Sequence, residues 1–484
     1  MQVTQASSAP GGGMSIRIRG GSSVNGNNEP LYVIDGFPVE NNPAADGDPT
    51  NGGRVNTAPT NPLAALNPSD IASIEILKDA SATAIYGSRG ANGVVIITTK
   101  RGDPGKPNVT IDAYTASQQV AKRHDLLNGT QFATFANEWA TAQNQTKPFA
   151  DPTVFGAGTD WQSAIFRTAP MSNIQVSVTG GTSGTNATRY ALSGGIFQQA
   201  GVVTNSDFRR ATLRGNIDQT VGRLKLSGSL FLSRVNSSQV PVDGTFNAGA
   251  GAVGGALQYV PVMPIRNADG SYTLNRTDYP AALRAAGAAP GDLPNPVSMA
   301  NDVIDKLSDP RVLANAAGEY TFPGNLKLRV TAGTDISDRG RDTYYPRITL
   351  QGLINNGSAI RGTTQTTNFL NENTLALQHN FASIHDITLL GGYTRQEQTQ
   401  VRQSLSNTQF VSDITSFDDI GAATQVGGPT VSSTRTRYST ASYLGRANYT
   451  LLDRYLFSYT GRYNGSSRFG ANNQWGYFPT FGAG

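Results

Sequence analysis

After residue 108 the chain alternates between apolar or small residues and polar residues for most of its length. The clearest segment is residues 224–232, where leucine or glycine fills most of the alternate positions and Lys225, Ser227 and Ser229 stand between them. Because successive side chains of a strand point to opposite faces of its sheet, this period of two predicts strands with one apolar and one polar face. We count about twelve such segments, each near the ~9–11 residues that cross a bilayer as a tilted strand. They lie at residues 109–115, 174–178, 190–196, 211–217, 224–232, 314–322, 326–332, 375–377, 387–393, 443–449 and 455–463, and a last one begins near Trp475.

The connections between these segments alternate in length. Short connections are expected around residues 181–186, 219–222, 323–325, 383 and 451–454, and long ones at residues 120–171, 235–310, 336–367 and 398–435, with a moderate gap near Gly201. This parity is typical of an outer-membrane β-barrel, which has short periplasmic turns and long external loops. A soluble β-sandwich also has alternating strands, but its fold gives no reason for this parity. No segment approaches the ~18 consecutive apolar residues of a membrane helix.

The first 104 residues do not follow this alternation, and they predict a small α/β domain. A strand is expected at residues 16–19 and a second at residues 31–34, which the turn pair Asp35-Gly36 ends. Residues 38–62 are rich in Pro, Asn, Asp and Gly, a composition that predicts a loop.

Residues 67–102 are the most explicit part of this domain. Asn67 is placed to cap a short helix that begins at Pro68. Residues 94–99 are β-branched at every position, which predicts a strand buried on both faces. The elements expected between them are a strand at residues 74–77, a short helix at residues 80–86 that ends at Gly87, and a loop that contains Gly90 and Gly93.

A linker with two prolines at residues 103–107 separates the two patterns. We therefore expect a first domain at residues 1–104 and the sheet at residues 105–484. Charged residues make up only 15% of the chain, against about 25% in ordinary soluble domains, which suits a wall that is apolar on one side. The net charge of +4 comes from scattered residues, and without a basic stripe no nucleic-acid surface is expected.

The sequence predicts no catalytic site, metal site or cofactor. None of the three histidines is spaced as a zinc ligand, and the absence of cysteine excludes thiolate chemistry and disulfides. Gly87, Gly90 and Gly93 follow an expected helix instead of preceding one, which argues against a phosphate-binding loop. The acidic turns at residues 46–48 and 267–270 lack a full set of calcium ligands. We therefore expect a protein that is not an enzyme.

Several phrases between residues 16 and 102 resemble the plug domain of the SusC/RagA family of TonB-linked outer-membrane transporters, and they follow the family's order. The phrases are Ile16-Arg17-Ile18-Arg19-Gly20, Pro30-Leu31-Tyr32-Val33-Ile34-Asp35-Gly36, Asn67-Pro68 with Asp70-Ile71, Ile74-Glu75-Ile76-Leu77-Lys78-Asp79-Ala80-Ser81-Ala82, Ala84-Ile85-Tyr86-Gly87 and Gly90-Ala91-Asn92-Gly93-Val94. The motif residues expected to shape the plug are Arg17, Arg19, Gly20, Asp35, Gly36, Asp79, Tyr86, Gly87, Gly90 and Gly93.

The resemblance implies a mixed fold, in which a small α/β plug domain precedes and closes an antiparallel transmembrane β-barrel of ~22 strands. It implies import of a large nutrient, an oligosaccharide or a peptide, across the Gram-negative outer membrane without bond-making chemistry. The implied partners are the TonB energy-transducing complex, a SusD-like surface lipoprotein that covers the external face, and outer-membrane lipid.

We expect the chain to be a fragment that holds most of the plug and about half of the barrel. Residues 1–15 show no signal-peptide pattern, and about twelve strands are fewer than the family implies. An open half-barrel leaves two unpaired sheet edges, which lipid does not tolerate. We therefore expect this chain alone to form no stable membrane pore, and a folded, heat-modifiable band in detergent would contradict that expectation.

Candidate ligand-binding residues are polar or aromatic residues on expected loops, because loops often carry function. They are Asn41, Asn42, Asp46, Asp48, Asn51 and Arg54 on the first long loop, and Trp161 and Tyr259, whose rings are suited to stacking on sugars. Two other functions stay open: an outer-membrane receptor or adhesin that senses without importing, and a soluble extracellular β-protein that binds carbohydrate.

Overall fold

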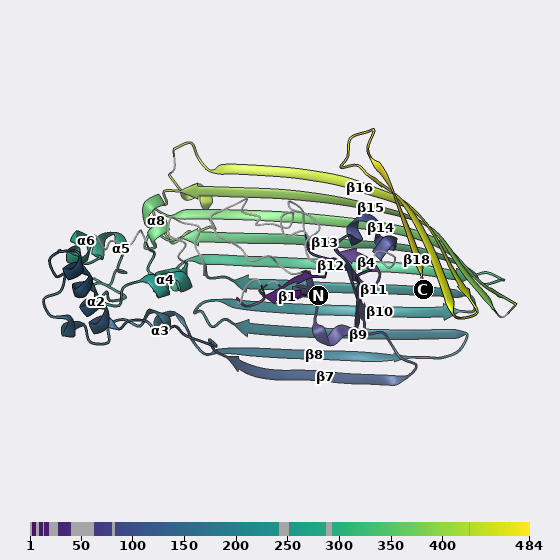
Figure 1. The fold of residues 1–484 in the computed structure, drawn as a ribbon, viewed down its shortest axis with the longest axis horizontal. Helices are drawn as coiled ribbons and strands as arrows, with labels where there is room; N and C mark the ends of the chain where they lie inside the picture. The colour runs from purple at the N-terminus through teal and green to yellow at the C-terminus, as the bar shows by residue number, and fades with distance from the viewer. Residues whose placement is uncertain are drawn as a thin grey trace.

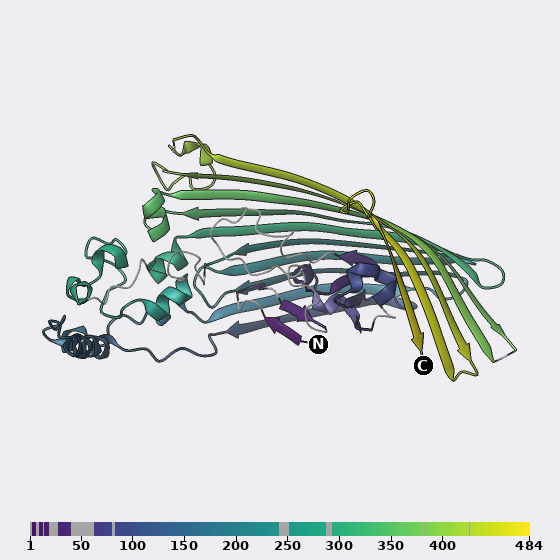
Figure 2. The same cartoon turned by 45° about the horizontal axis from the view of Figure 1, so that its top comes forward.

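The computed structural model of the chain describes residues 2–5, 9–12, 14–18, 28–39, 62–79, 83–241, 251–286, 293–382, 384–424 and 426–484. Its largest feature is a wall of twelve antiparallel strands, in which each strand pairs with its neighbours in the chain. The wall is curved, and the N-terminal elements lie against one of its faces (Figures 1 and 2). The strands are β7 (Gly105–Gln118), β8 (Ala169–Gly181), β9 (Asn186–Ala200), β10 (Asp207–Val221), β11 (Leu224–Ser238), β12 (Ile304–Thr321), β13 (Leu326–Tyr345), β14 (Ser358–Phe381), β15 (His385–Thr408), β16 (Thr430–Leu451), β17 (Tyr455–Ser466) and β18 (Trp475–Ala483).

The predicted fold class, a small plug followed by an incomplete antiparallel barrel wall, is confirmed. The alternation of short and long connections is confirmed as well. Short turns gather at one end of the strands and the helices of the long connections at the other (Figure 1). Among the described residues, none of the helices has the length and apolar character needed to cross a membrane.

Two strands are much longer than the sequence pattern predicts. β14 and β15 have 24 residues each, and the connection expected at residues 336–367 shrinks to the gap between β13 and β14. The added segments are largely polar on both faces, so they have no apolar period to detect. Ion pairs join neighbouring strands in this polar region: Arg361 of β14 pairs with Asp342 of β13 at 2.7 Å, and Arg341 of β13 pairs with Asp305 of β12 at 2.6 Å.

The plug is a four-stranded sheet in the order β4-β3-β6-β5. The buried strand expected at residues 94–99 is present as β6 (Val94–Thr99), between β3 (Leu31–Ile34) and β5 (Ile71–Leu77). The sequence missed β4 (Phe37–Val39), because three residues around a proline carry no alternation. Asp35 and Gly36 join β3 to β4 with φ of 49° and 86°, as a two-residue hairpin turn requires.

Two short helices of the plug were predicted from the sequence. Asn67 caps η2 (Pro68–Asp70) as expected, because its side chain accepts a hydrogen bond from the Ser69 N–H at 3.2 Å. The prediction that Gly87 ends a helix is confirmed, because its φ of 62° and ψ of −144° are not helical. A second short helical turn follows Gly87, and the two turns together make up η3 (Ala84–Gly90). A separate hairpin, β1 (Gln2–Gln5) with β2 (Met14–Arg17), precedes this sheet.

The two longest connections fold onto each other as a small unit, which we call the loop cap. It contains α2 (Gly129–Ala142), η4 (Pro152–Phe155), α3 (Trp161–Ile165), α4 (Ala252–Gln258), α5 (Asn275–Asp278), α6 (Ala281–Ala285) and α7 (Pro296–Asn301). Buried side chains from both connections share one hydrophobic core, among them Ile165 and Leu283. The sequence did not predict this unit, because all its helices except the 14-residue α2 have seven residues or fewer, too few to show a clear period.

Asn295 is the polar centre of the loop cap, and its loss is expected to loosen α7. Its side chain caps α7 at Val297 N, donates to the carbonyls of Ile265 and Thr273 at 3.1 Å each, and is 1% exposed. Asn295→Ala leaves these buried groups unpaired and should lower the local stability by about 2–3 kcal/mol. The exposed cap of α2, Asn128, is the matched control, for which alanine should cost about 1 kcal/mol. Hydrogen exchange in the full-length protein measures the loss in α7 for Asn295→Ala and in α2 for Asn128→Ala, and equal losses would contradict the prediction.

Candidate functional site

The candidate site is the interface between the plug and the concave face of the wall. Three patches of this interface are described in turn: a polar anchor around Asp70, an apolar patch around Phe37, and a patch around η3. Each joins a plug element to inward-facing side chains of the wall.

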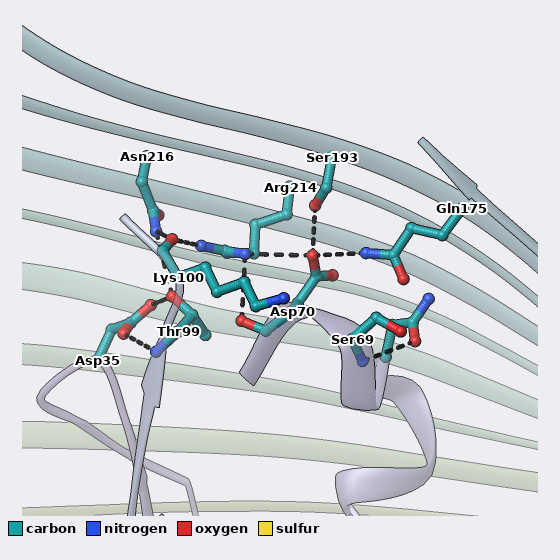
Figure 3. Close-up of polar contacts among 10 residues, drawn as sticks. Asp35, Ser69, Asp70, Thr99, Lys100, Gln175, Ser193, Arg214 and Asn216 are labelled. Carbon is teal, nitrogen blue, oxygen red and sulfur yellow. Dashed lines mark hydrogen bonds and ion pairs between the residues drawn. The ribbon is translucent and has the colours of Figure 1, made fainter. Parts of the chain in front are cut away.

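The polar anchor is centred on Asp70, the last residue of η2, which is 3% exposed. Its Oδ1 accepts hydrogen bonds from Gln175 at 2.8 Å and Ser193 at 2.6 Å, and it forms an ion pair with Arg214 Nη1 at 3.2 Å. These partners come from the neighbouring strands β8, β9 and β10 (Figure 3). One plug carboxylate therefore connects three strands of the wall.

The end of β6 completes the anchor. Arg214 donates a second hydrogen bond to the carbonyl of Lys100, and Asn216 donates to the same carbonyl and to the Thr99 hydroxyl, both at 3.1 Å. Asp35 accepts a hydrogen bond from the Thr99 N–H at 2.9 Å (Figure 3). A buried ion pair offsets its desolvation only when further hydrogen bonds satisfy its atoms. Here such bonds come from both the plug and the wall, and they leave the Arg214 Nε as the one atom of the ion pair that is buried without a partner among the described residues.

The apolar patch seats one aromatic ring of the plug in the wall. Phe37 of β4 is 1% exposed, and a Cβ added to Gly333 of β13 would lie 2.7 Å from its ring. A real Cβ does not approach that closely, so the ring occupies space that only glycine leaves free. The other buried members from this region include Val39 and Leu66 of the plug and Phe231, Leu313 and Leu370 of the wall.

The third patch brings η3 against β15 and β17. Arg89 donates a hydrogen bond to the side chain of Gln396, and Gly87 lies close to the side chains of Arg462 and Asn464. Burial raises the pKa of the Tyr86 hydroxyl, and the carboxylate of Glu372 raises it further. Tyr86 therefore stays neutral at physiological pH.

The structure describes eight of the ten predicted plug-motif residues. Asp35 and Gly36 form the β3–β4 turn, Tyr86, Gly87 and Gly90 lie in η3, and Gly93, with φ 92°, lies close to Ile18. Arg17 ends β2, and Asp79 follows β5. Arg19 and Gly20 lie outside the described residues. The individual roles of all ten stay predictions.

The predicted ligand-binding residues are not brought together in the described part of the chain. Asn41, Asn42, Asp46, Asp48, Asn51 and Arg54 lie outside the described residues. Trp161 and Tyr259 contact each other inside the loop cap, with ring centroids 4.6 Å apart, and are 3% and 4% exposed. The Trp161 Nε1–H donates to the Val260 carbonyl and the Tyr259 hydroxyl to the Thr273 carbonyl. Their contact with a ligand stays a prediction.

Sequence reasoning missed the wall side of the anchor: Gln175, Ser193, Arg214 and Asn216. The sequence held a weak signal for them, because each lies at one of the alternate polar positions of a predicted strand. That alternation says that these side chains face the interior. It does not say which plug residue they meet, since the contacting residues are more than 100 positions apart.

Known proteins resemble the chain in both parts. A family model described as the TonB-dependent Receptor Plug Domain matches residues 1–94. TonB-dependent receptor P3 of Formosa agariphila is 33% identical over 97% of the chain and 42% of its own length. TonB-dependent receptor SusC of Bacteroides thetaiotaomicron is 32% identical over 100% of the chain and 46% of its own length. The chain therefore spans less than half the length of these relatives.

The fold has a counterpart among solved structures. The RagAB peptide transporter structure superposes with a TM-score of 0.81 at 23% identity, over 100% of this chain and 54% of that chain. At that identity the match supports the fold alone. The plug match and the sequence relatives imply the outer membrane of a Gram-negative bacterium. The chain belongs to the SusC/RagA family of TonB-dependent receptors.

Proposed function

We propose that the protein of which this chain is part imports a large nutrient, an oligosaccharide or a peptide, across the outer membrane in a TonB-dependent manner. One observation carries the proposal: a folded plug lies against the inward face of the wall. A small set of residues, those of the polar anchor and the apolar patch, holds it there. A plug so placed blocks passage along that face while the contacts hold. Passage then requires that part of the plug be displaced.

The mechanism is binding and gating. Ligand contacts the long connections and the plug, and TonB then pulls on the plug from the periplasm. The anchor and the apolar patch resist that pull, so the segment that moves has to be less stable than the wall. We further propose that the plug comprises residues 1–104 and the wall residues 105–484, which the start of β7 at Gly105 supports.

The partners are proposed from the relatives. SusC and the RagAB structures support a SusD-like lipoprotein that closes the end of the wall where the long connections gather. The loop cap lies at that end (Figure 1) and is therefore the part of the chain that such a lipoprotein would meet first.

A deletion of the full-length gene in its host tests the function. The strain is grown on a panel of oligosaccharides and oligopeptides as sole carbon sources, with and without a plasmid copy of the gene, and again in a tonB deletion. We expect growth on at least one compound to require both genes. Unchanged growth on every compound would contradict import. A loss of gene induction by a compound that still enters would instead support a sensing receptor.

A further inference from the structure

A row of glycines crosses three neighbouring strands of the wall. Gly391 of β15 is paired in register with Gly445 of β16, which is paired with Gly461 of β17. A Cβ added to Gly391 or Gly445 would meet no atom within 4 Å, whereas one added to Gly461 would lie 2.7 Å from the Tyr477 hydroxyl. The row is therefore an open floor at Gly391 and Gly445, and the Tyr477 side chain covers it at Gly461. Each of its three strands has a paired neighbour on both sides.

Larger side chains rise on both sides of this floor. The register places Tyr393, Tyr443 and Tyr463 along one side and Leu389, Ala447 and Tyr459 along the other. The resulting hollow, which we call the glycine groove, has a volume of about 560 Å³. The hydroxyls of Tyr459 and Tyr477 form a hydrogen bond with each other at one end of the groove.

The glycine groove lies on the outward face of the wall. Thr460 and Arg462 are 2% and 4% exposed on the concave side, so Gly461 between them faces away from the plug. On β15 the outward-facing positions beside the groove are uncharged, and the first charged ones towards the long connections are Arg395 and Glu397. The Arg395 side chain is more than half exposed and that of Glu397 about one quarter. The groove thus belongs to an uncharged band of the kind that faces lipid in outer-membrane barrels.

The groove also lies at the depth of the hydrocarbon. β16 ends at Leu451, where a short turn follows, and Gly445 lies six residues before that end. The distance along the strand from Gly445 to this turn is about 20 Å. The hydrocarbon core is about 30 Å thick, so the groove falls inside it. This step rests on the proposed position in the outer membrane.

A hollow that faces lipid has to be filled, because wall atoms without neighbours lose their dispersion contacts. Lipid chains are as apolar as the wall, so shape decides what binds there. A groove with a glycine floor, tyrosines along one side and Leu389, Ala447 and Tyr459 along the other fits one flexible, unbranched chain. Arg446 is the charged residue of its lining, and it has the inward parity of β16, so the outward face offers no charged side chain to a headgroup. We propose that the glycine groove holds one acyl chain of a phospholipid from the leaflet next to the short turns.

Native mass spectrometry of the full-length, delipidated protein tests this proposal by titration with dioleoyl phosphatidylethanolamine. Gly445→Val fills the floor with a side chain that suits a strand. Gly194→Val is the matched control, because Gly194 faces outward on β9, and its added Cβ would make ordinary contacts with the Leu213 side chain at 3.7 Å and the Thr212 carbonyl oxygen at 3.8 Å. Heat-modifiable migration in gels checks that both variants fold.

We expect one discrete bound lipid in the wild-type protein and in Gly194→Val, and about tenfold weaker binding in Gly445→Val. Equal binding by all three proteins, or no discrete lipid on the wild type, would overturn the proposal. A dimer that Gly445→Val dissociates would also overturn it, because a second copy would then fill the groove. The growth assay for import is independent of these results, so either proposal can fail without the other.

Discussion

Asp70→Ala in the full-length protein is expected to weaken the attachment of the plug to the wall by about 3–5 kcal/mol. Removing the carboxylate leaves the Arg214 guanidinium buried at 4% exposure without its counter-ion. Gln175 and Ser193 lose their acceptor at the same time. A buried charge without its counter-ion destabilises a protein by more than the intact ion pair stabilises it. The loss of stability should therefore exceed that expected from the lost hydrogen bonds alone.

The partly exposed ion pair between Arg101 and Asp218 provides the control. It also joins the end of β6 to β10, at 2.8 Å, but the Arg101 side chain is 34% exposed. Solvent screens such a pair, so Arg101→Ala should cost about 0–1 kcal/mol. The urea midpoint of plug release, followed by protease cleavage within residues 62–100, measures both variants. Equal midpoints would show that Asp70 is not the anchor.

Phe37→Ala is expected to destabilise the seated plug by about 3–5 kcal/mol, because it empties a site that the wall cannot close. Gly333→Ala should cost about 1–3 kcal/mol for the opposite reason, since its Cβ meets the Phe37 ring at 2.7 Å. The two changes should not add. Once the ring is gone, the nearest neighbour left to the added methyl is the Ala314 carbonyl oxygen at 3.2 Å, so the double variant should lose less stability than the sum of the two single effects.

A double-mutant cycle on the same urea midpoint measures this coupling. Phe469→Ala is the control, because that ring is 61% exposed, and its loss should change stability by no more than about 0.5 kcal/mol. If the two single effects added in full, Phe37 would not be seated over Gly333 in the functional protein.

The sequence predicted those features that one strand or one turn determines locally. The period of two in residues 224–232 gave β11, and the β-branched run at residues 94–99 gave β6. Asp35-Gly36 gave the turn that ends β3, because few other residues adopt two successive positive φ angles. These signals depend only on side-chain direction and backbone preference.

Features that depend on distant partners were not predictable. The 24-residue length of β14 and β15 comes from backbone pairing and inter-strand ion pairs in segments with no apolar period. Trp161 and Tyr259 have aromatic side chains of the kind that stacks on sugar rings, yet their rings pack on each other in the loop cap. Asp70 belongs to a recognised plug phrase, but its pairing with Arg214 appears only when β10 is set beside η2.

Ion conductance of the full-length protein in a planar bilayer tests most directly whether the plug closes the wall and is the part that moves. We predict no steady conductance at rest, and a large conductance when about 3 M urea is added on the side of the short turns, which disappears when the urea is removed. The Asp70→Ala protein should open at lower urea concentration than the Arg101→Ala protein. Steady conductance of the wild type without urea, or loss of the plug and the wall in one irreversible step, would contradict this account.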